Sequence, residues 1–196
     1  INVCGQRYIG TRLYTPQHLK MEIEIFGTPG NDLAAFLYGH KIIVHGNAQD
    51  GVGNTMDGGE IIVQGRAGDV LGFSMRGGEI YVRDNCGYRT ALHMKEYEGK
   101  RPVLVVGGRA QDFLGEYMAG GIVIILDLLG VGFHVARVAF ASQVAEVRPP
   151  TPDTVTPFLL DLPHCLHPLH FIPNDNHVQL HPVIVNLFYL LPNRTM

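Results

Sequence analysis

The sequence has no tryptophan, only three cysteines and few charged residues of either sign. Aromatic residues make up 9% and charged residues 17% of its 196 positions. Lysine and arginine total 15 and form no basic run, so the composition gives no reason to expect nucleic acid as a partner. Apolar stretches such as Ile122 to Leu129, which contains Asp127, are far shorter than a membrane span, so no membrane partner is expected.

The scarcity of cysteine argues against a disulfide-stabilised protein. Cys4, Cys86 and Cys165 lie far apart and form no C-x-x-C motif. A reducing, cytoplasmic compartment is therefore the simplest interpretation. Glycine, in contrast, is abundant at 24 residues, and 46% of the chain is hydrophobic, which indicates a packed protein with many tight corners rather than a disordered one.

A 19-residue unit occurs in two successive copies, at 46–64 and 65–83. The same phase continues upstream, and downstream a short insertion at about 95–102 interrupts it. The phase returns at Gly108 and fades after Leu126. A fixed period of this length indicates stacked supersecondary units.

The repeats share slots of constant character. One long apolar slot holds Leu37, Met56, Met75, Met94 and Met118, and another holds Leu33, Val52, Leu71 and Leu114. Pairs that alternate as in a strand are Ile42/Val44, Ile61/Val63, Ile80/Val82 and Val123/Ile125. Glycines recur just before each strand, at 39, 58, 77 and 120 and at 59, 78 and 121. Glycine in such a slot fits a corner that needs positive φ or a close approach of two backbones.

These slots predict an all-β fold, because the unit is too short for a helix, a strand and two loops. We predict a right-handed parallel β-helix, a solenoid of about six coils in which neighbouring strands lie about 4.8 Å apart. The right-handed form is favoured because the unit contains no six-residue sub-repeat. The predicted β-helix domain is 1–148, with regular coils at 21–126 and an irregular first coil or cap at 1–20. Residues 127–148 are expected to form either one more degraded coil or a helix.

A change of composition at the Pro-Pro-Thr-Pro sequence predicts an irregular C-terminal extension, 149–196, rich in proline, histidine and leucine. Its apolar segment 183–191 is expected to cap the solenoid, pack along its flank or dock on a partner. The extension contains a cluster of residue types that ligate metals, namely His164, Cys165, His167 and His170. Prolines break their spacing, so no metal site is predicted. His177 and His181 lack the glutamate of an H-E-x-x-H motif.

No pattern in the sequence predicts catalysis or cofactor binding. Phosphate-loop, dinucleotide-binding and nucleophile-elbow motifs are absent from the sequence. An acidic slot holds Asn31, Asp50, Asp69 and Asp112, which suggests a cation ladder or paired acid–base carboxylates. Capping of backbone N–H groups at a corner is the favoured interpretation, because the slot recurs with the fold. We therefore predict no catalytic, cofactor-binding or metal-binding residues.

The coil pattern G-x-A-G-D-x-x-G-x-x-M-x-G-G-x-I-x-V resembles the G-x-G-x-G domain at the carboxyl end of the glutamate synthase large subunit. It is also similar to the related C-type subunit of formylmethanofuran dehydrogenase. The likeness covers about 21–126, and the segments 27–33, 84–107 and 115–121 look more like the glutamate synthase version. The resemblance implies a right-handed β-helix. It also implies a cytoplasmic, non-catalytic scaffold that needs no cofactor of its own. That scaffold would hold glutaminase and FMN/iron–sulfur synthase subunits of an oxidoreductase complex that makes glutamate.

Two other interpretations stand beside this one. The first is the equivalent scaffold of a formylmethanofuran dehydrogenase, which neighbouring genes would distinguish. The second is a solenoid enzyme of the hexapeptide acyltransferase type, against which the missing hexad period and the missing histidine in a coil cleft both argue. Self-association into a homo-oligomer is compatible with all of them.

Overall fold

The computed structural model describes residues 1–14, 19–126, 136–140 and 143–147. They belong to a unit that extends from Ile1 to Arg148. The predicted C-terminal extension, 149–196, lies outside the described residues together with its histidine and cysteine cluster.

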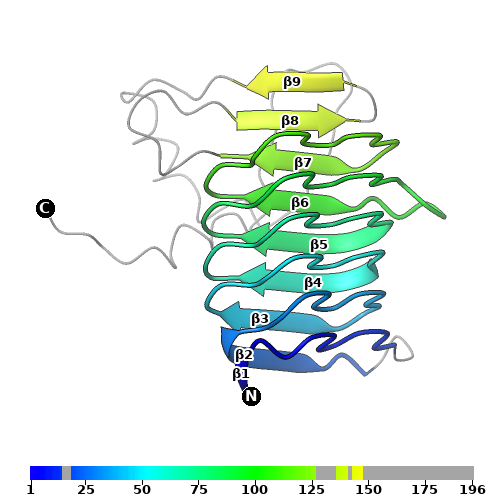
Figure 1. Ribbon diagram of the computed structural model, residues 1–196. Helices are drawn as coiled ribbons and strands as arrows, with labels where there is room; N and C mark the ends of the chain where they lie inside the picture. Colours follow the sequence, from blue (N-terminus) through cyan, green and yellow to red (C-terminus); the bar gives the residue numbers. More distant parts are fainter. Residues whose placement is uncertain (15–18, 127–135, 141–142, 148–196) are drawn as a thin grey trace, which may run out of the picture. The chain divides into compact units, whose positions relative to one another are not determined.

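The strands follow one another in sequence order, and each pairs with the next (Figure 1). The parallel strands are β1 (Asn2–Cys4), β2 (Glu22–Thr28), β3 (Lys41–His45), β4 (Asp57–Val63), β5 (Gly77–Val82), β6 (Val103–Val106) and β7 (Ile122–Ile125). The described residues contain no helix. The predicted all-β parallel solenoid is therefore confirmed, with about five turns rather than six coils.

Two more strands, β8 (Ala136–Phe140) and β9 (Gln143–Val147), extend the sheet after β7. They are antiparallel, β8 to β7 and β9 to β8. Both alternatives for 127–148, a helix or a further parallel coil, are therefore wrong at these strands. Since only two residues separate β8 from β9, an antiparallel hairpin suits the connection, whereas a parallel coil needs a much longer one.

The repeat sets the register of the parallel strands. Ile23, Ile42, Ile61 and Ile80 pair in succession, each one full period after the last. The partner of Ile80 on the next strand is Leu104, so this step along the chain is longer than the period. The predicted insertion accounts for the longer step, and a bridge between Tyr97 and Lys100 closes it into a small hairpin.

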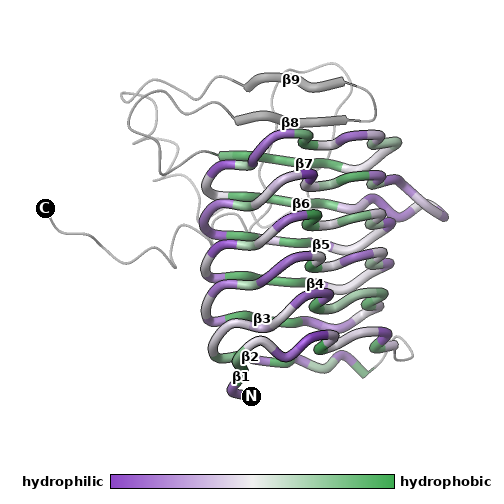
Figure 2. The backbone as a smooth tube through the Cα atoms, in the orientation of Figure 1, coloured by the Kyte–Doolittle hydropathy of each residue, from purple (hydrophilic) through white to green (hydrophobic). Residues whose placement is uncertain are grey.

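The interior of the coils is filled by the apolar slots. Figure 2 shows that the strands β3 to β7 are largely hydrophobic, whereas the bends at which the strands end are hydrophilic. The inward strand residues pack against long side chains from the other side of each coil. The following residues of this set are all fully buried: Ile42, Val44, Leu33, Leu37, Val52, Met56, Leu71, Met75 and Met94. Met118 and Leu114, in the last coil, are only partly buried. Close packing of these ladders explains why each slot keeps its size from coil to coil.

Opposite the strands, each coil has five residues with an unusual alternating backbone, and we call these segments the turn ladder (32–36, 51–55, 70–74, 89–93 and 113–117). The first, third and fifth residues of every segment have positive φ, even where they are not glycine. Their N–H groups bond to neighbouring coils in alternation: Gly51 donates to Asp69 of the next coil at 2.9 Å, and Gly53 donates to Leu33 of the preceding coil at 2.9 Å. These bonds bind successive coils together on the side that has no strands.

The first residues of the chain form a coil of the same design. Tyr8, Gly10 and Arg12 have positive φ, as in the turn ladder. The N–H group of Arg12 donates to the carbonyl oxygen of Ala35 at 2.8 Å. The start of the chain was expected to form either a first coil or a cap, and residues 1–14 form a first coil.

Candidate functional site

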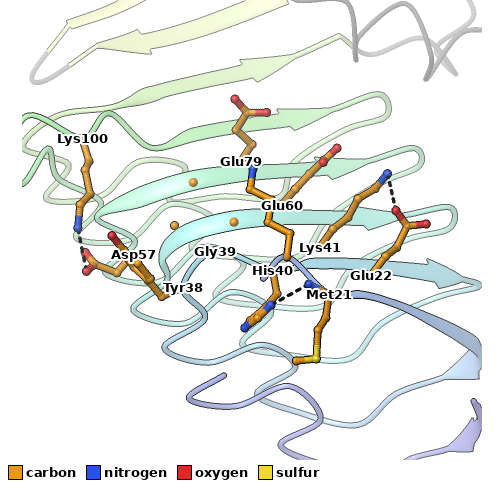
Figure 3. A pocket seen from close by; sticks show the side chains of 14 residues that line it. Met21, Glu22, Tyr38, Gly39, His40, Lys41, Asp57, Glu60, Glu79 and Lys100 are labelled. Atoms are coloured by element: carbon orange, nitrogen blue, oxygen red, sulfur yellow. Dashed lines mark hydrogen bonds and ion pairs between the residues drawn. The ribbon is translucent and has the colours of Figure 1, made fainter. Parts of the chain in front are cut away.

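A groove of about 690 Å³ crosses the glycine corner at the start of β3, β4 and β5 (Figure 3). Gly39, Gly58, Gly59 and Gly78 line it, so part of its surface is bare backbone. Charged side chains stand on both sides of these glycines, as Figure 3 shows. A Cβ atom on Gly59 would lie 2.4 Å from the carbonyl oxygen of His40, and one on Gly78 would lie 2.6 Å from Met56 Cε, so these glycines allow neighbouring coils to stack closely.

One wall is built around Asp57. The Lys100 ammonium donates to Asp57 Oδ2 at 3.1 Å and lies 4.9 Å from the centre of the Tyr38 ring. The bond to Asp57 raises the pKa of Lys100 above its ordinary value. On the other side, Arg76 Nε lies 3.6 Å from Asp57 Oδ1. A Cβ atom on Gly77 would lie 2.6 Å from the carbonyl oxygen of Asp57 and 3.1 Å from the Lys100 stem, so the close approach of the neighbouring backbone requires glycine here.

The other wall is a column of charged residues at one register position of four strands. Glu22 pairs with Lys41 across the ladder, Lys41 with Glu60, and Glu60 with Glu79. The Lys41 ammonium lies 3.3 Å from the Glu22 carboxylate. Charges therefore alternate over the first three positions, and the fourth places two carboxylates side by side.

Glu79 takes its hydrogen bond from a neutral donor. The Tyr81 hydroxyl donates to Glu79 Oε2 at 2.6 Å. Tyr81 is 1% exposed, and its pKa is raised first by burial and then by the bond to Glu79 and the charges of Glu79 and Glu60. In the described part of the chain, no lysine, arginine or histidine nitrogen lies within 4.0 Å of the Glu79 carboxylate. This end of the groove is therefore rich in hydrogen-bond acceptors.

A second surface, the aromatic face, lies on the turn ladder and consists of Arg89, His93, Phe113 and Tyr117. Phe113 is 59% and Tyr117 71% exposed. The Arg89 guanidinium lies 5.6 Å from the centre of the Phe113 ring, and the His93 and Tyr117 rings stack at 5.1 Å. These contacts join equivalent positions of adjacent coils, so the repeat itself aligns the rings.

The side chains of the acidic slot cap backbone N–H groups at a corner, which is the interpretation favoured from the sequence. Asp50 Oδ1 accepts the N–H of Asp69 at 2.9 Å, and Asp69 Oδ1 accepts the N–H of Tyr88 at 2.9 Å. Asn31 makes a longer bond of the same kind, 3.4 Å to the N–H of Asp50. Tyr88 occupies this slot between Asp69 and Asp112, so the carboxylates do not form a continuous ladder.

A second capping slot was not predicted. Asn47 Oδ1 accepts the N–H of Arg66 at 3.0 Å, and Asn85 Oδ1 accepts that of Arg109 at 2.8 Å. In the sequence, an asparagine occurs one coil before each of these arginines. The slot alternates between asparagine and arginine, so it does not stand out as a conserved position of the repeat.

Within the described residues, no three histidine, cysteine or acidic side chains are grouped so as to hold a metal ion. The metal-type cluster of the sequence, His164 to His170, lies outside them. Cys4 is exposed, and Cys86 is 3% exposed. The Thr90 hydroxyl donates to Cys86 Sγ at 3.2 Å. The described residues also contain no helix with the length and apolar character to cross a bilayer.

A glycine-cornered parallel solenoid with charged and aromatic outer surfaces is the class of protein that these residues define. The model of the GXGXG motif family matches residues 2–137. The chain belongs to this family, which is that of the glutamate synthase C-terminal domain.

The chain is also similar to MJ1350, an uncharacterized protein of Methanocaldococcus jannaschii. The two are 64% identical over 104 residues, which cover 53% of this chain and 39% of the relative. The chain thus matches about two fifths of the length of that relative. No solved structure matches the chain.

Proposed function

We propose that this chain is a non-catalytic structural subunit or domain of a glutamate synthase-like complex. It holds glutaminase and FMN/iron–sulfur synthase subunits in the cytoplasm and so serves glutamate biosynthesis without chemistry of its own. Membership of the GXGXG motif family supports this role, because that family includes the carboxyl-terminal domain of glutamate synthase.

The observation that carries the proposal is the aromatic face. Phe113 and Tyr117 are large side chains that are mostly exposed to solvent, beside the exposed Arg89. Aromatic residues and arginine are enriched where protein interfaces gain most of their binding energy. The turn ladder beneath is fixed by backbone hydrogen bonds between coils, so the face is presented on a rigid frame and loses little entropy on docking.

The experiment is co-purification with the tagged full chain, followed by identification of the bound proteins. We expect glutaminase-type and synthase-type subunits to be retained, and the double substitution Phe113→Ser with Tyr117→Ser to release them. Tyr14→Ser is the matched control, because Tyr14 is 68% exposed but lies on another corner, against Tyr38. Turnover of glutamine by the purified chain alone, or full retention of partners by the double variant, would contradict the proposal.

A further inference from the structure

We propose that the insertion hairpin, 95–102, is a strap that opens and closes as a unit over the glycine corner, with the ion pair between Lys100 and Asp57 as its latch. The name strap is used below for this segment. The strap works in the same way whichever subunits the chain holds.

The two ends of the strap are fixed in the stack of coils. The Lys95 N–H donates to the carbonyl oxygen of Met75 at 3.0 Å, and the carbonyl oxygen of Pro102 accepts the N–H of Ile122 at 2.9 Å. Between these ends, Tyr97 and Lys100 exchange two backbone hydrogen bonds, of 3.2 and 2.9 Å. The strap is therefore a closed hairpin with two anchored ends, and such a segment can move as one body.

Side chains hold the middle of the strap against earlier coils. The Lys100 ammonium donates to Asp57 Oδ2 at 3.1 Å and lies 4.9 Å from the centre of the Tyr38 ring (Figure 3). The Tyr97 ring centre lies 5.3 Å from the Arg76 guanidinium. The strap thus bridges the corners at which β4 and β5 begin.

Little apolar burial supports this position. Residues 95–99 are all exposed, Tyr97 by 41%. A Cβ atom on Gly99 would meet nothing within 4 Å. Segments with few buried apolar contacts open at a much lower free energy than the whole protein, and partly exposed ion pairs stabilise a closed position only weakly.

The closed strap also leaves two charged groups poorly paired. Arg76 Nε lies 3.6 Å from Asp57 Oδ1, which is too long for a hydrogen bond. Both atoms are buried and have no hydrogen-bond partner within the described residues. Unsatisfied buried groups raise the free energy of the state that contains them. When Lys100 and Tyr97 withdraw, water reaches both atoms or Arg76 closes on Asp57, so the closed and open positions are near in free energy.

Opening changes the groove. Lys100 is part of one wall, so its withdrawal widens the groove there and uncovers the Tyr38 ring. The latch therefore controls access to the glycine corner from the side of the insertion.

The test uses the isotope-labelled full chain, with relaxation dispersion of the amide NMR signals of 96–101 as the measure of the open population. Lys100→Met keeps the side-chain stem but removes the charge, and should raise the open population about fivefold. Sodium chloride at about 1 M should raise it in the native protein and leave the Lys100→Met variant unchanged, because salt screens the latch.

Asp57→Asn tests the latch from its other side. It should open the strap by a similar factor, and should shift the Tyr38 ring signals in the same direction as Lys100→Met does, because both changes release the ammonium from the ring. The double variant should open the strap no further than the stronger single change, since the two remove one contact.

Lys95→Met is the matched control, because it removes the same charge from the same strap. In the described part of the chain, the Lys95 ammonium has no carboxylate within 4.0 Å. An equal effect of Lys95→Met, an unchanged open population in Lys100→Met, or Tyr38 signals that ignore Asp57→Asn would each overturn the proposal. Amide signals of the turn ladder that move together with the strap would also overturn it, because opening would then not be local.

Discussion

Asp50 reaches across to the next coil and accepts the backbone N–H of Asp69, one period later, at 2.9 Å. Asp69 repeats the same bond to Tyr88. A backbone N–H at a corner has no strand partner, so a short acidic side chain from the coil below supplies the acceptor. The acidic slot is thus a connection between coils, which explains why it recurs with the repeat and not with a separate binding site.

Replacing Asp69 with alanine should destabilise the protein by about 1 kcal/mol, the typical net value of such a hydrogen bond. The loss stays small because the Tyr88 N–H is exposed and water replaces the carboxylate. Asp69→Asn keeps the oxygen that accepts, and should retain most of the stability. Urea unfolding of the three proteins measures the difference, and an asparagine variant as damaged as the alanine variant would show that charge rather than capping matters.

Substitution by alanine should affect the stability of the protein very differently at the neighbouring glycines Gly58 and Gly59. Gly59 has φ of +98°, and a Cβ atom there would lie 2.4 Å from the carbonyl oxygen of His40. Gly58 has no positive φ, and its nearest contact would be 3.4 Å, to the Tyr38 ring. We expect Gly59→Ala to cost more than about 2 kcal/mol and Gly58→Ala to be close to neutral. Thermal unfolding of both variants checks this, and equal losses would show that the corner is not set by backbone approach.

Side-chain spacing was the part of the fold that the sequence could predict. Two apolar slots and an alternating pair recur with the period of the repeat, and Met56 and Ile61 lie in the core as their slots require. Register followed from the same count, because strands that repeat at a fixed interval stack with equivalent residues in line, as Ile42 does with Ile61.

The turn ladder could not be predicted in the same way. Positive φ is expected of glycine, yet Asp32, Phe36 and Phe113 adopt it. For Asp32 and Phe36 this strain is accepted because their N–H groups donate to the carbonyl oxygens of Asp50 and Asn54 in the next coil, a long-range effect that local preference does not contain. The groove was missed for a related reason: Lys100 reaches Asp57 only because the insertion folds back over two coils, and no spacing in the sequence links the two.

Met75 should be the costlier of two methionines from the same slot. Met75 is fully buried in the centre of the stack, whereas Met118 is partly buried in the last parallel coil. Met75→Ala leaves a cavity between two coils and should cost about 2–5 kcal/mol. Met118→Ala should cost clearly less. Chemical unfolding of both variants measures the difference, and comparable losses would indicate that the stack is no better packed at its centre than at its end.

The stability of the protein should fall in alkaline solution partly because of Cys86. Burial raises the pKa of its thiol from 9.0 to about 11, although the hydrogen bond from Thr90 acts in the opposite direction. Between these two pH values the unfolded chain loses the proton that the folded protein keeps. The folded state then binds more protons than the unfolded state, so the free energy of unfolding decreases as pH rises from about 9 to about 11.

Cys86→Ala should abolish this part of the pH dependence, which amounts to about 2–3 kcal/mol at most. Alanine already fills the same slot at Ala48 and Ala67, so the variant should fold normally. Tyr81 and Lys100 also have raised pKa values and add to the alkaline decline in both proteins. The difference between the two unfolding curves, measured in urea from about pH 8 to about pH 11, therefore isolates the thiol, and parallel curves would mean that Cys86 is not held in its neutral form by the fold.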